Sequence, residues 1–228
     1  MAVKALDLFC GAGGASIGLA EAGYEVTGVD LEDQPRYPFH FVKGDALDPP
    51  VDPREFDLVW ASPPCQAHSA LRNAPNAKPH PDLIGPTRER LIEWGRPWII
   101  ENVEGAPLRD PLMLCCTMFG VFTIHHGFYE MQRHRLFESS AEGLEAPGVC
   151  RHQYPVCGIY GGHVRDRRRK PDGTPYPDLR KEVGEYLMGV EQGVFTLAEL
   201  SQMIPPRYSR HLAAQIKRRG ELVQQTLF

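Results

Sequence analysis

Two short apolar segments flank a glycine-rich turn within the first thirty residues. Residues 4–9 and 25–30 have the composition of buried strands, and residues 13–22 carry small and apolar side chains on one side, as in a helix. A strand, a helix and a second strand in this order start a βαβ unit, whose two strands lie parallel in one sheet. The sequence therefore predicts an α/β fold.

The turn between the first strand and the helix contains Gly11, Gly13 and Gly14. Because glycine has no Cβ, such a turn can be tight and its backbone can approach a ligand closely. Asp30 ends the second strand, where a carboxylate can accept hydrogen bonds from ribose hydroxyls. The glycine spacing differs from that of the dinucleotide fingerprint, so the turn either binds a nucleoside cofactor or simply connects two elements.

A third apolar segment, residues 56–60, runs into Pro63, Pro64 and Cys65. The proline pair ends the strand and places Cys65 at its carboxyl end, where open α/β sheets keep their ligand crevice. Cys65 is therefore a candidate nucleophile. The alternative is a free cysteine that only fills space in the core.

A fourth apolar segment, residues 98–100, is followed by Glu101 and Asn102. Neighbouring parallel strands lie about 4.8 Å apart, so side chains at the ends of two such strands can face one substrate ring. We expect Glu101 to lie near Cys65, although a carboxylate after an apolar strand can also cap a neighbouring helix.

The rest of the chain has weaker local patterns. We expect a strand at residues 40–44, helices at 87–95, 112–120, 196–203 and 208–219, and a strand or hairpin at 122–130. Pro205 and Pro206 separate the last two helices.

Four motifs in chain order resemble those of the DNA (cytosine-5-)-methyltransferase family. They are Asp-Leu-Phe-Cys-Gly-Ala-Gly-Gly at 7–14, Pro-Cys-Gln at 64–66, Glu-Asn-Val at 101–103 and Gln-Arg-His-Arg at 132–135. The resemblance covers residues 1–137 and extends to 184–216. It implies a Rossmann-like sheet of a SAM-dependent methyltransferase, with a small C-terminal recognition region and S-adenosylmethionine (SAM) as cofactor. The family's usual Gly-Asn-x-Val motif is replaced by residues 204–209.

The resemblance assigns roles to individual residues. The implied catalytic residues are Cys65, Glu101, Arg133 and Arg135. The implied cofactor-binding residues are Phe9, Gly11, Gly13, Gly14, Asp30, Asp45 and Pro63. Gln66, Ser69 and Asn102 are the implied contacts to the substrate base or its backbone.

In the implied reaction a cysteine thiolate adds to a cytosine ring before the methyl group is transferred. Cys65 would add at C6, Glu101 would support N3 and Arg135 would lie at O2. The base has to be flipped out of double-stranded DNA or start in a single strand. RNA or a free cytosine nucleotide is an alternative substrate, and a catalytically silent module that binds nucleic acid or SAM is a further alternative.

Three parts of the chain follow from this resemblance. Residues 1–137 are expected to form the SAM-binding catalytic domain, residues 138–183 a reduced target-recognition region, and residues 184–228 helices that return to the catalytic domain. The recognition region contains the basic residues Arg165, Arg167, Arg168, Arg169 and Lys170. We expect them to contact DNA phosphates, although such runs also occur as solvated surface charge. So small a region predicts a short target of about two to four base pairs, or relaxed context.

The same region contains Cys150, His152, Cys157 and His163, which are possible zinc ligands. Their spacing does not match the paired short spacings of common zinc modules, and isolated cysteines and histidines often only pack. The sequence therefore predicts no metal.

Composition restricts the compartment and the partners. The chain has 228 residues, six cysteines without a regular framework and a net charge of −4. We expect reduced thiols, a monomer in the cytoplasm, no signal peptide and no membrane contact. Because the net charge is negative, contact with nucleic acid has to come from local basic patches. The sequence does not decide whether a restriction partner exists.

Overall fold

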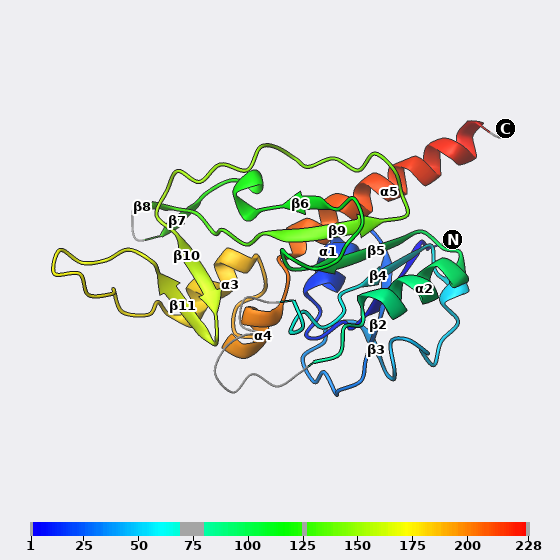
Figure 1. Ribbon diagram of the computed structural model, residues 1–228, viewed down its shortest axis with the longest axis horizontal. Helices are drawn as coiled ribbons and strands as arrows, with labels where there is room; N and C mark the ends of the chain where they lie inside the picture. Colours follow the sequence, from blue (N-terminus) through cyan, green and yellow to red (C-terminus); the bar gives the residue numbers. More distant parts are fainter. Residues whose placement is uncertain (1, 69–79, 125–126, 227–228) are drawn as a thin grey trace.

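The computed structural model of the protein describes residues 2–68, 80–124 and 127–226. Its centre is a seven-stranded sheet in the order β3-β2-β1-β4-β5-β9-β6 (Figure 1). The first five strands in this order are parallel, and β9 lies antiparallel between β5 and β6. The strands are β1 Lys4–Leu8, β2 Glu25–Asp30, β3 His40–Lys43, β4 Leu58–Ala61, β5 Trp98–Asn102, β6 Leu112–Leu114 and β9 Arg135–Ser139. The fold is thus the Rossmann-like α/β fold that the sequence predicts.

The central strands are buried on both faces. All residues of β4 and β5 are buried, as continuous apolar runs in parallel sheets usually are. Helices α1 (Gly14–Glu21) and α5 (Pro206–Thr226) contribute to the core on one face, and α2 (Ile84–Trp94) to the core on the other. This arrangement confirms the predicted strands at both ends of the first helix and before Cys65.

Glycines allow α5 to pack directly on α1. A Cβ on Gly14 would overlap the Met203 side chain and the carbonyl oxygen of Ile204, and a Cβ on Gly18 would overlap the Pro206 carbonyl oxygen. The Ser209 hydroxyl donates a 2.8 Å hydrogen bond to the carbonyl oxygen of Ala15. The C-terminal helix is therefore fixed against the first helix of the chain.

Gly18→Ala is expected to destabilise the protein. Alanine normally favours a helix over glycine by up to about 1 kcal/mol, but overpacking of a tight contact costs about 1–3 kcal/mol. Because the added Cβ would meet backbone atoms of α5, we expect a lower melting temperature. Gly85→Ala in α2 is the matched control, since a Cβ there meets open space and should raise the melting temperature slightly. A Gly18→Ala variant as stable as wild type would contradict this packing.

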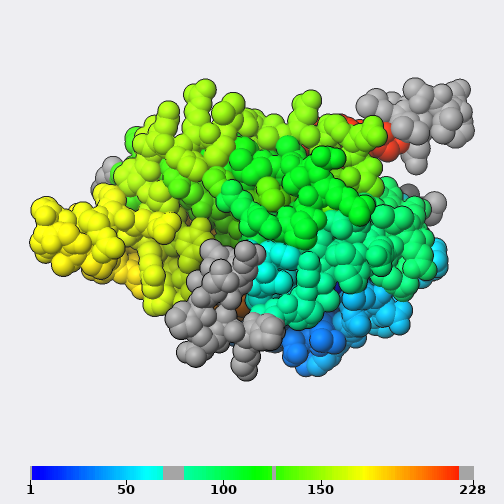
Figure 2. Space-filling view, in the orientation of Figure 1, coloured from blue at the N-terminus to red at the C-terminus, as the bar shows by residue number. Residues whose placement is uncertain are grey.

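The segment between β6 and α5 forms a smaller second part. It contains the hairpins β7 (Phe122–Ile124) with β8 (Gly127–Tyr129) and β10 (Cys157–Tyr160) with β11 (His163–Asp166). Helices α3 (Lys181–Met188) and α4 (Leu197–Gln202) pack against β10 and β11. In the space-filling view the yellow residues after β11 protrude at one end of the molecule (Figure 2). Two short 3₁₀ helices lie before β4 and after β6, η1 (Pro53–Glu55) and η3 (Cys116–Phe119).

The predicted helix at 112–120 is wrong. Residues Leu112–Leu114 form β6, which pairs with β9, and η3 follows. A short apolar run does not distinguish a strand from a buried helix, and here pairing with a distant strand decides. The helix expected at 87–95 begins earlier, at Ile84. The hairpin expected within 122–130 and the two C-terminal helices are confirmed.

A buried ion pair joins α2 to β9. The Arg88 guanidinium binds Glu138 through both carboxylate oxygens, at 2.6 and 2.7 Å. Glu138 also accepts the amide of Arg109 at 2.8 Å. Strand β9 itself pairs with β5 as far as Ser139. The central sheet thus extends two residues beyond 137, the last residue of the expected catalytic domain.

Candidate active site

A pocket of about 560 Å³ lies at the carboxyl ends of β1, β2, β4 and β5. This edge is where open α/β sheets bind their ligands. Nine of the residues assigned from the sequence line it: Phe9, Gly11, Gly14, Asp30, Pro63, Cys65, Gln66, Glu101 and Arg135. The pocket therefore combines most of the expected cofactor and catalytic residues in one cavity.

The turn after β1 is held in an unusual backbone conformation. Phe9 and Gly11 have positive φ values of 57° and 49°. The Gly11 amide donates to Asp30 Oδ2 at 2.9 Å, and Asp30 Oδ1 accepts the Glu32 amide at 3.0 Å. Positive φ in a residue with a Cβ is strained, and such strain is concentrated at functional sites. Asp30 thereby links the glycine turn to the end of β2.

Two of the expected cofactor residues do not line the pocket. Gly13 packs near Tyr37, and its φ of 92° suits the start of α1. Asp45 accepts the Leu47 amide at 2.9 Å. The buried neighbour of Asp45, Ala46, is the residue that reaches the pocket. Gly13 and Asp45 are therefore next to pocket residues in the chain but do not line the pocket themselves.

Cys65, Glu101 and Arg135 meet in the pocket from three segments. Cys65 follows β4, Glu101 lies in β5 and Arg135 begins β9. Arg135 Nε lies 3.0 Å from Glu101 Oε1, and both side chains are largely buried. The neighbouring strands place the carboxylate beside the thiol, as the sequence predicts.

Burial is the largest influence on the pKa values of Glu101 and Cys65. It raises the pKa of Glu101, and Arg135 opposes that shift. Burial also raises the pKa of the Cys65 thiol, as does the negative charge of Glu101, whereas Arg135 lowers it. A raised carboxyl pKa widens the pH range in which Glu101 is protonated and can donate a hydrogen bond. Arg135 is the nearby positive charge that favours a thiolate.

Asn102 positions the Cys65 loop. Its side-chain amide donates to the Pro63 carbonyl oxygen at 2.9 Å, and its own oxygen accepts the Val103 amide at 2.9 Å. The residue is 1% exposed. This corrects the expectation that Asn102 contacts the substrate, because both ends of its amide are used within the protein. Ser69, the remaining expected contact, lies outside the described residues.

Asp7 lines the pocket but was not among the expected site residues. Ser16 Oγ donates to its Oδ2 at 2.5 Å, whereas its buried Oδ1 has no hydrogen-bond partner among the described residues. Burial raises the pKa of Asp7 to about 7. An orphaned buried acceptor beside a glycine turn suits a ligand with a cationic donor. Asp7 was missed because nothing in the sequence distinguishes a ligand-facing carboxylate within a strand from any other strand residue.

The far wall of the pocket comes from the C-terminal part of the chain. Helix α4 and the residues after it contribute Glu199, Ser201, Gln202, Met203 and Ile204. These residues thus share the pocket with the residues that follow β1 and β4. The individual residues were missed, because the family motif that would mark them is replaced there.

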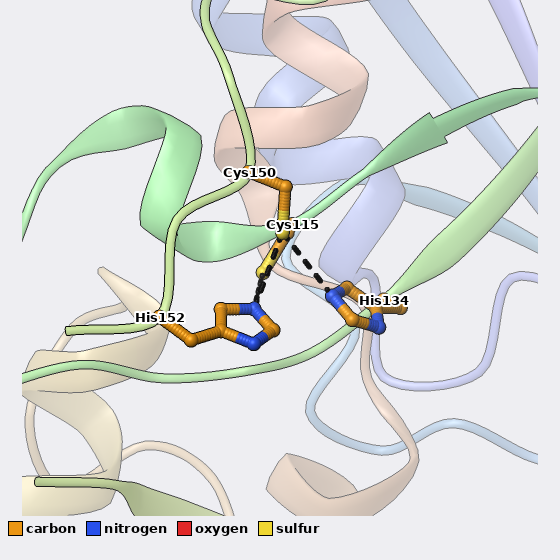
Figure 3. Close-up of side chains that lie close together, drawn as sticks. All are labelled: Cys115, His134, Cys150 and His152. Atoms are coloured by element: carbon orange, nitrogen blue, oxygen red, sulfur yellow. Dashed lines mark hydrogen bonds between the residues drawn. The ribbon is translucent and has the colours of Figure 1, made fainter. Parts of the chain in front are cut away.

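The possible zinc ligands named from the sequence do not form one group. Cys157 is fully buried in β10, and His163 Nδ1 lies 2.6 Å from Asp178. Cys150 and His152 instead lie beside two residues from other segments, Cys115 and His134 (Figure 3). Of the four possible zinc ligands named from the sequence, Cys157 and His163 are therefore wrong.

Arg133 supports the fold instead of facing the base. Its guanidinium donates to the carbonyl oxygens of Ile159, Ser201 and Met203 at 3.1, 2.7 and 2.7 Å. The side chain is 1% exposed, and burial lowers its pKa to about 10. This corrects the expected catalytic role of Arg133, because the residue does not line the pocket and its two terminal nitrogens bind the backbone of β10 and of the α4 segment.

Arg168 is also engaged within the protein. It pairs with both oxygens of buried Asp166, at 3.0 and 2.5 Å, and lies 4.8 Å from the centre of the Tyr129 ring. The expected phosphate contact at Arg168 stays a prediction, and the guanidinium already has a carboxylate partner.

The other basic residues of the run point to the surface. Arg165, Arg167 and Arg169 are exposed, although Arg165 has Asp178 at 3.7 Å. Arg165 belongs to β11, and the other two follow it. None of the three lines the pocket, and Arg167 and Arg169 belong to the protruding segment after β11.

Comparisons with known proteins indicate a methyltransferase. Residues 6–69 match a family described as "Methyltransferase domain". A Type II methyltransferase, M.HgiDI of Herpetosiphon aurantiacus, is 27% identical over 131 residues, which cover 52% of this chain and 42% of that protein. The chain thus spans less than half the length of this relative. The domain match supports SAM as the cofactor.

Two solved structures have a similar fold over nearly the whole chain. One is a putative DNA modification methyltransferase encoded within an E. coli prophage, with a TM-score of 0.62 and 13% identity over 95% of this chain and 99% of that chain. The other is the Dnmt2 methyltransferase of S. pombe, with a TM-score of 0.62, 12% identity and the same coverage. At this identity the likeness concerns the fold.

Among the helices in the described ranges, none is long and apolar enough to cross a bilayer.

Proposed function

We propose that this protein transfers a methyl group from SAM to C5 of cytosine in DNA, through a covalent adduct between Cys65 and C6 of a flipped base. One observation carries the proposal. Cys65, Glu101 and Arg135 line the same pocket as the glycine turn and Asp30. A nucleophile, an acid and a cation thus share a cavity with the elements suited to a nucleoside cofactor.

The fit of SAM rests on three features of the pocket. A Cβ on Gly11 would meet nothing within 4 Å, so the turn leaves room for a ligand. Asp30 lies at the end of β2, where ribose hydroxyls are bound in such folds. The free oxygen of Asp7 offers an acceptor for a cationic group. When bound, SAM supplies the electrophilic sulfonium methyl group.

The protein's own residues prepare the cytosine. Cys65 attacks C6 as a thiolate, with Arg135 nearby as a positive charge, and the ring becomes nucleophilic at C5. Glu101 in its protonated form donates to N3 and offsets the negative charge moved into the ring. After methyl transfer, a base removes the C5 proton and the thiolate of Cys65 leaves C6. Asn102 holds the loop that carries the thiol.

The test is methyl transfer from radiolabelled SAM to double-stranded DNA, single-stranded DNA and RNA of the same sequence. We expect label in DNA and 5-methylcytosine after digestion. Label confined to RNA would favour the alternative substrate, and N4-methylcytosine would refute the C5 mechanism. Bisulfite sequencing of the treated DNA measures the target, which we expect to be about two to four base pairs because few side chains are available for base contacts.

Arg167 and Arg169 are expected to contact DNA phosphates. The double variant Arg167→Gln/Arg169→Gln should bind all DNA sequences more weakly and reduce the slope of log affinity against log salt by about two. The double variant Lys4→Gln/Arg54→Gln is the control, since it removes the same charge from the start of β1 and from η1, and neither residue lines the pocket. Equal slopes in the two double variants would remove these arginines from the DNA interface.

A further inference from the structure

Four metal-binding side chains converge beside the central sheet. Cys115 follows β6, His134 immediately precedes β9, and Cys150 and His152 lie in the connection from β9 to β10 (Figure 3). One ligand atom from each residue lies within 4.8 Å of all the others. Three separate segments of the chain thus meet at one point.

The distances between these atoms match those of a tetrahedral metal site. Zinc bonds of about 2.3 Å to sulfur and about 2.05 Å to nitrogen require sulfur and nitrogen ligands to lie about 3.6 Å apart. The Sγ to Nε2 distances are 3.6 Å for Cys115 and His152, 3.4 Å for Cys150 and His134, and 3.2 Å for Cys150 and His152. Little movement is needed to place one ion among the four atoms.

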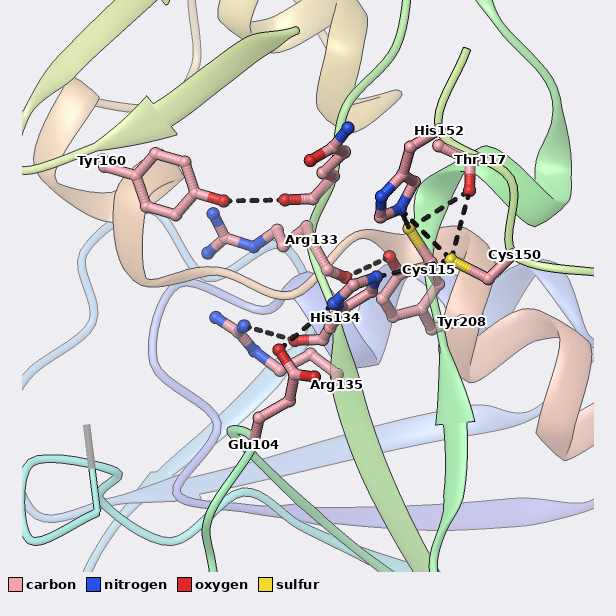
Figure 4. A network of polar contacts seen from close by, with 11 residues as sticks. Glu104, Cys115, Thr117, Arg133, His134, Arg135, Cys150, His152, Tyr160 and Tyr208 are labelled. Carbon is pink, nitrogen blue, oxygen red and sulfur yellow. Dashed lines mark hydrogen bonds and ion pairs between the residues drawn. The ribbon is translucent and has the colours of Figure 1, made fainter. Parts of the chain in front are cut away.

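The four side chains have hydrogen-bond partners of the kind that metal ligands usually have. Glu104 Oε2 lies 3.1 Å from His134 Nδ1, which leaves Nε2 of this histidine directed at Cys150. A carboxylate in this position fixes the ring and its tautomer in many zinc sites. Thr117 Oγ1 donates to Cys115 Sγ at 3.2 Å and lies 3.8 Å from Cys150 Sγ (Figure 4). Such a hydroxyl stabilises thiolate charge.

We propose that Cys115, His134, Cys150 and His152 bind one Zn²⁺ ion in a closed structural site. Both thiols lose their protons to solvent on binding, and both imidazoles bind as neutral rings, so the zinc and its four ligands carry no net charge. Tetrahedral S₂N₂ coordination by side chains favours zinc among the common divalent metals. All four positions are filled by protein, which leaves none open for catalysis.

The site joins the recognition region to the catalytic part. The connection that carries Cys150 and His152 has no regular secondary structure, and the metal would hold it on β6 and on the start of β9. His134 is adjacent to Arg135, whose guanidinium donates to the His134 carbonyl oxygen at 2.7 Å. Zinc would therefore stabilise the backbone from which Arg135 extends. This inference replaces the expectation of no metal.

Metal analysis of the full chain, purified without a histidine tag, tests the proposal. We expect about one zinc ion per wild-type chain and loss of that zinc in Cys150→Ser and His152→Gln. His152 is exposed, so its replacement should leave the fold intact. Cys65→Ser and His163→Gln are the controls that should retain zinc, because they remove the same side-chain types outside the cluster.

A second measurement does not depend on how the variants fold. Wild-type protein stripped by a chelator should bind Co²⁺ with the visible bands of tetrahedral coordination and a thiolate charge-transfer band, and its melting temperature should rise with metal. His152→Gln should show neither the full band intensity nor the same rise. Wild-type protein without zinc and without these Co²⁺ bands, or zinc retained in both ligand variants, would overturn the proposal.

Discussion

Cys65→Ala is expected to abolish methyl transfer while leaving SAM affinity unchanged. Loss of a nucleophile that forms a covalent intermediate typically lowers kcat by about four to six orders of magnitude. Cofactor binding should persist because the glycine turn follows β1 and Asp30 ends β2, and neither belongs to the segment that carries Cys65. Single-turnover transfer to DNA and calorimetric titration with SAM measure the two effects separately.

A trapping experiment makes this prediction sharper. DNA that contains 5-fluorocytosine should form a stable adduct with wild-type protein, because fluorine cannot leave C5 as a proton would. The adduct should be absent from Cys65→Ala and present in Cys10→Ala, a matched control in which another pocket cysteine is removed. Normal turnover by Cys65→Ala, or an adduct mapped to another cysteine, would refute the role of Cys65.

Glu101→Gln is expected to slow the chemical step by about two to four orders of magnitude, the range for positioned acid–base help. Glutamine keeps the shape and can still donate a hydrogen bond, but it cannot transfer a proton to N3. Its amide also replaces the partner of Arg135, whose Nε lies 3.0 Å from Glu101 Oε1. The single-turnover rate with saturating SAM and DNA is the quantity to measure.

The pH dependence provides a second test of Glu101. Burial raises the pKa of its carboxyl, so the protonated form is present below that pKa and is lost as the pH rises through it. The wild-type rate should therefore contain a component that falls with rising pH, and Glu101→Gln should lack it. A variant that alters only SAM affinity, with the same pH profile as wild type, would place Glu101 outside the chemistry.

The parallel core was predictable because its signals are local. Continuous apolar runs ended by Gly11 or by Pro63 and Pro64 mark β1 and β4, and the carboxyl ends of such strands must share one edge of the sheet. Cys65 and Glu101 could be placed near each other on that basis alone. The expected pairing of thiol and carboxylate needed no knowledge of distant segments.

Other features depended on contacts between distant segments, which composition does not reveal. The local pattern of residues 112–120 favours a helix, but Leu112–Leu114 form a strand because they pair with β9. The motif around Arg133 indicates a catalytic arginine, whereas in the structure its guanidinium binds carbonyl oxygens of the α4 segment. His134 and Cys115 are separated by eighteen residues from each other, and neither has the paired spacing by which zinc modules are recognised.

The contact of α4 with the cofactor pocket has a consequence for how the protein acquires activity. Met203 and Ile204 form part of the pocket wall and touch Gly14, so contacts nearly two hundred residues apart in sequence are needed before the cavity is complete. Long-range contacts of this kind form slowly because a large loop must close first. On the ribosome, residues 1–137 would emerge with an open groove, and SAM would gain its full affinity only after α4 had left the exit tunnel. Tight SAM binding would thus depend on the folding of α4.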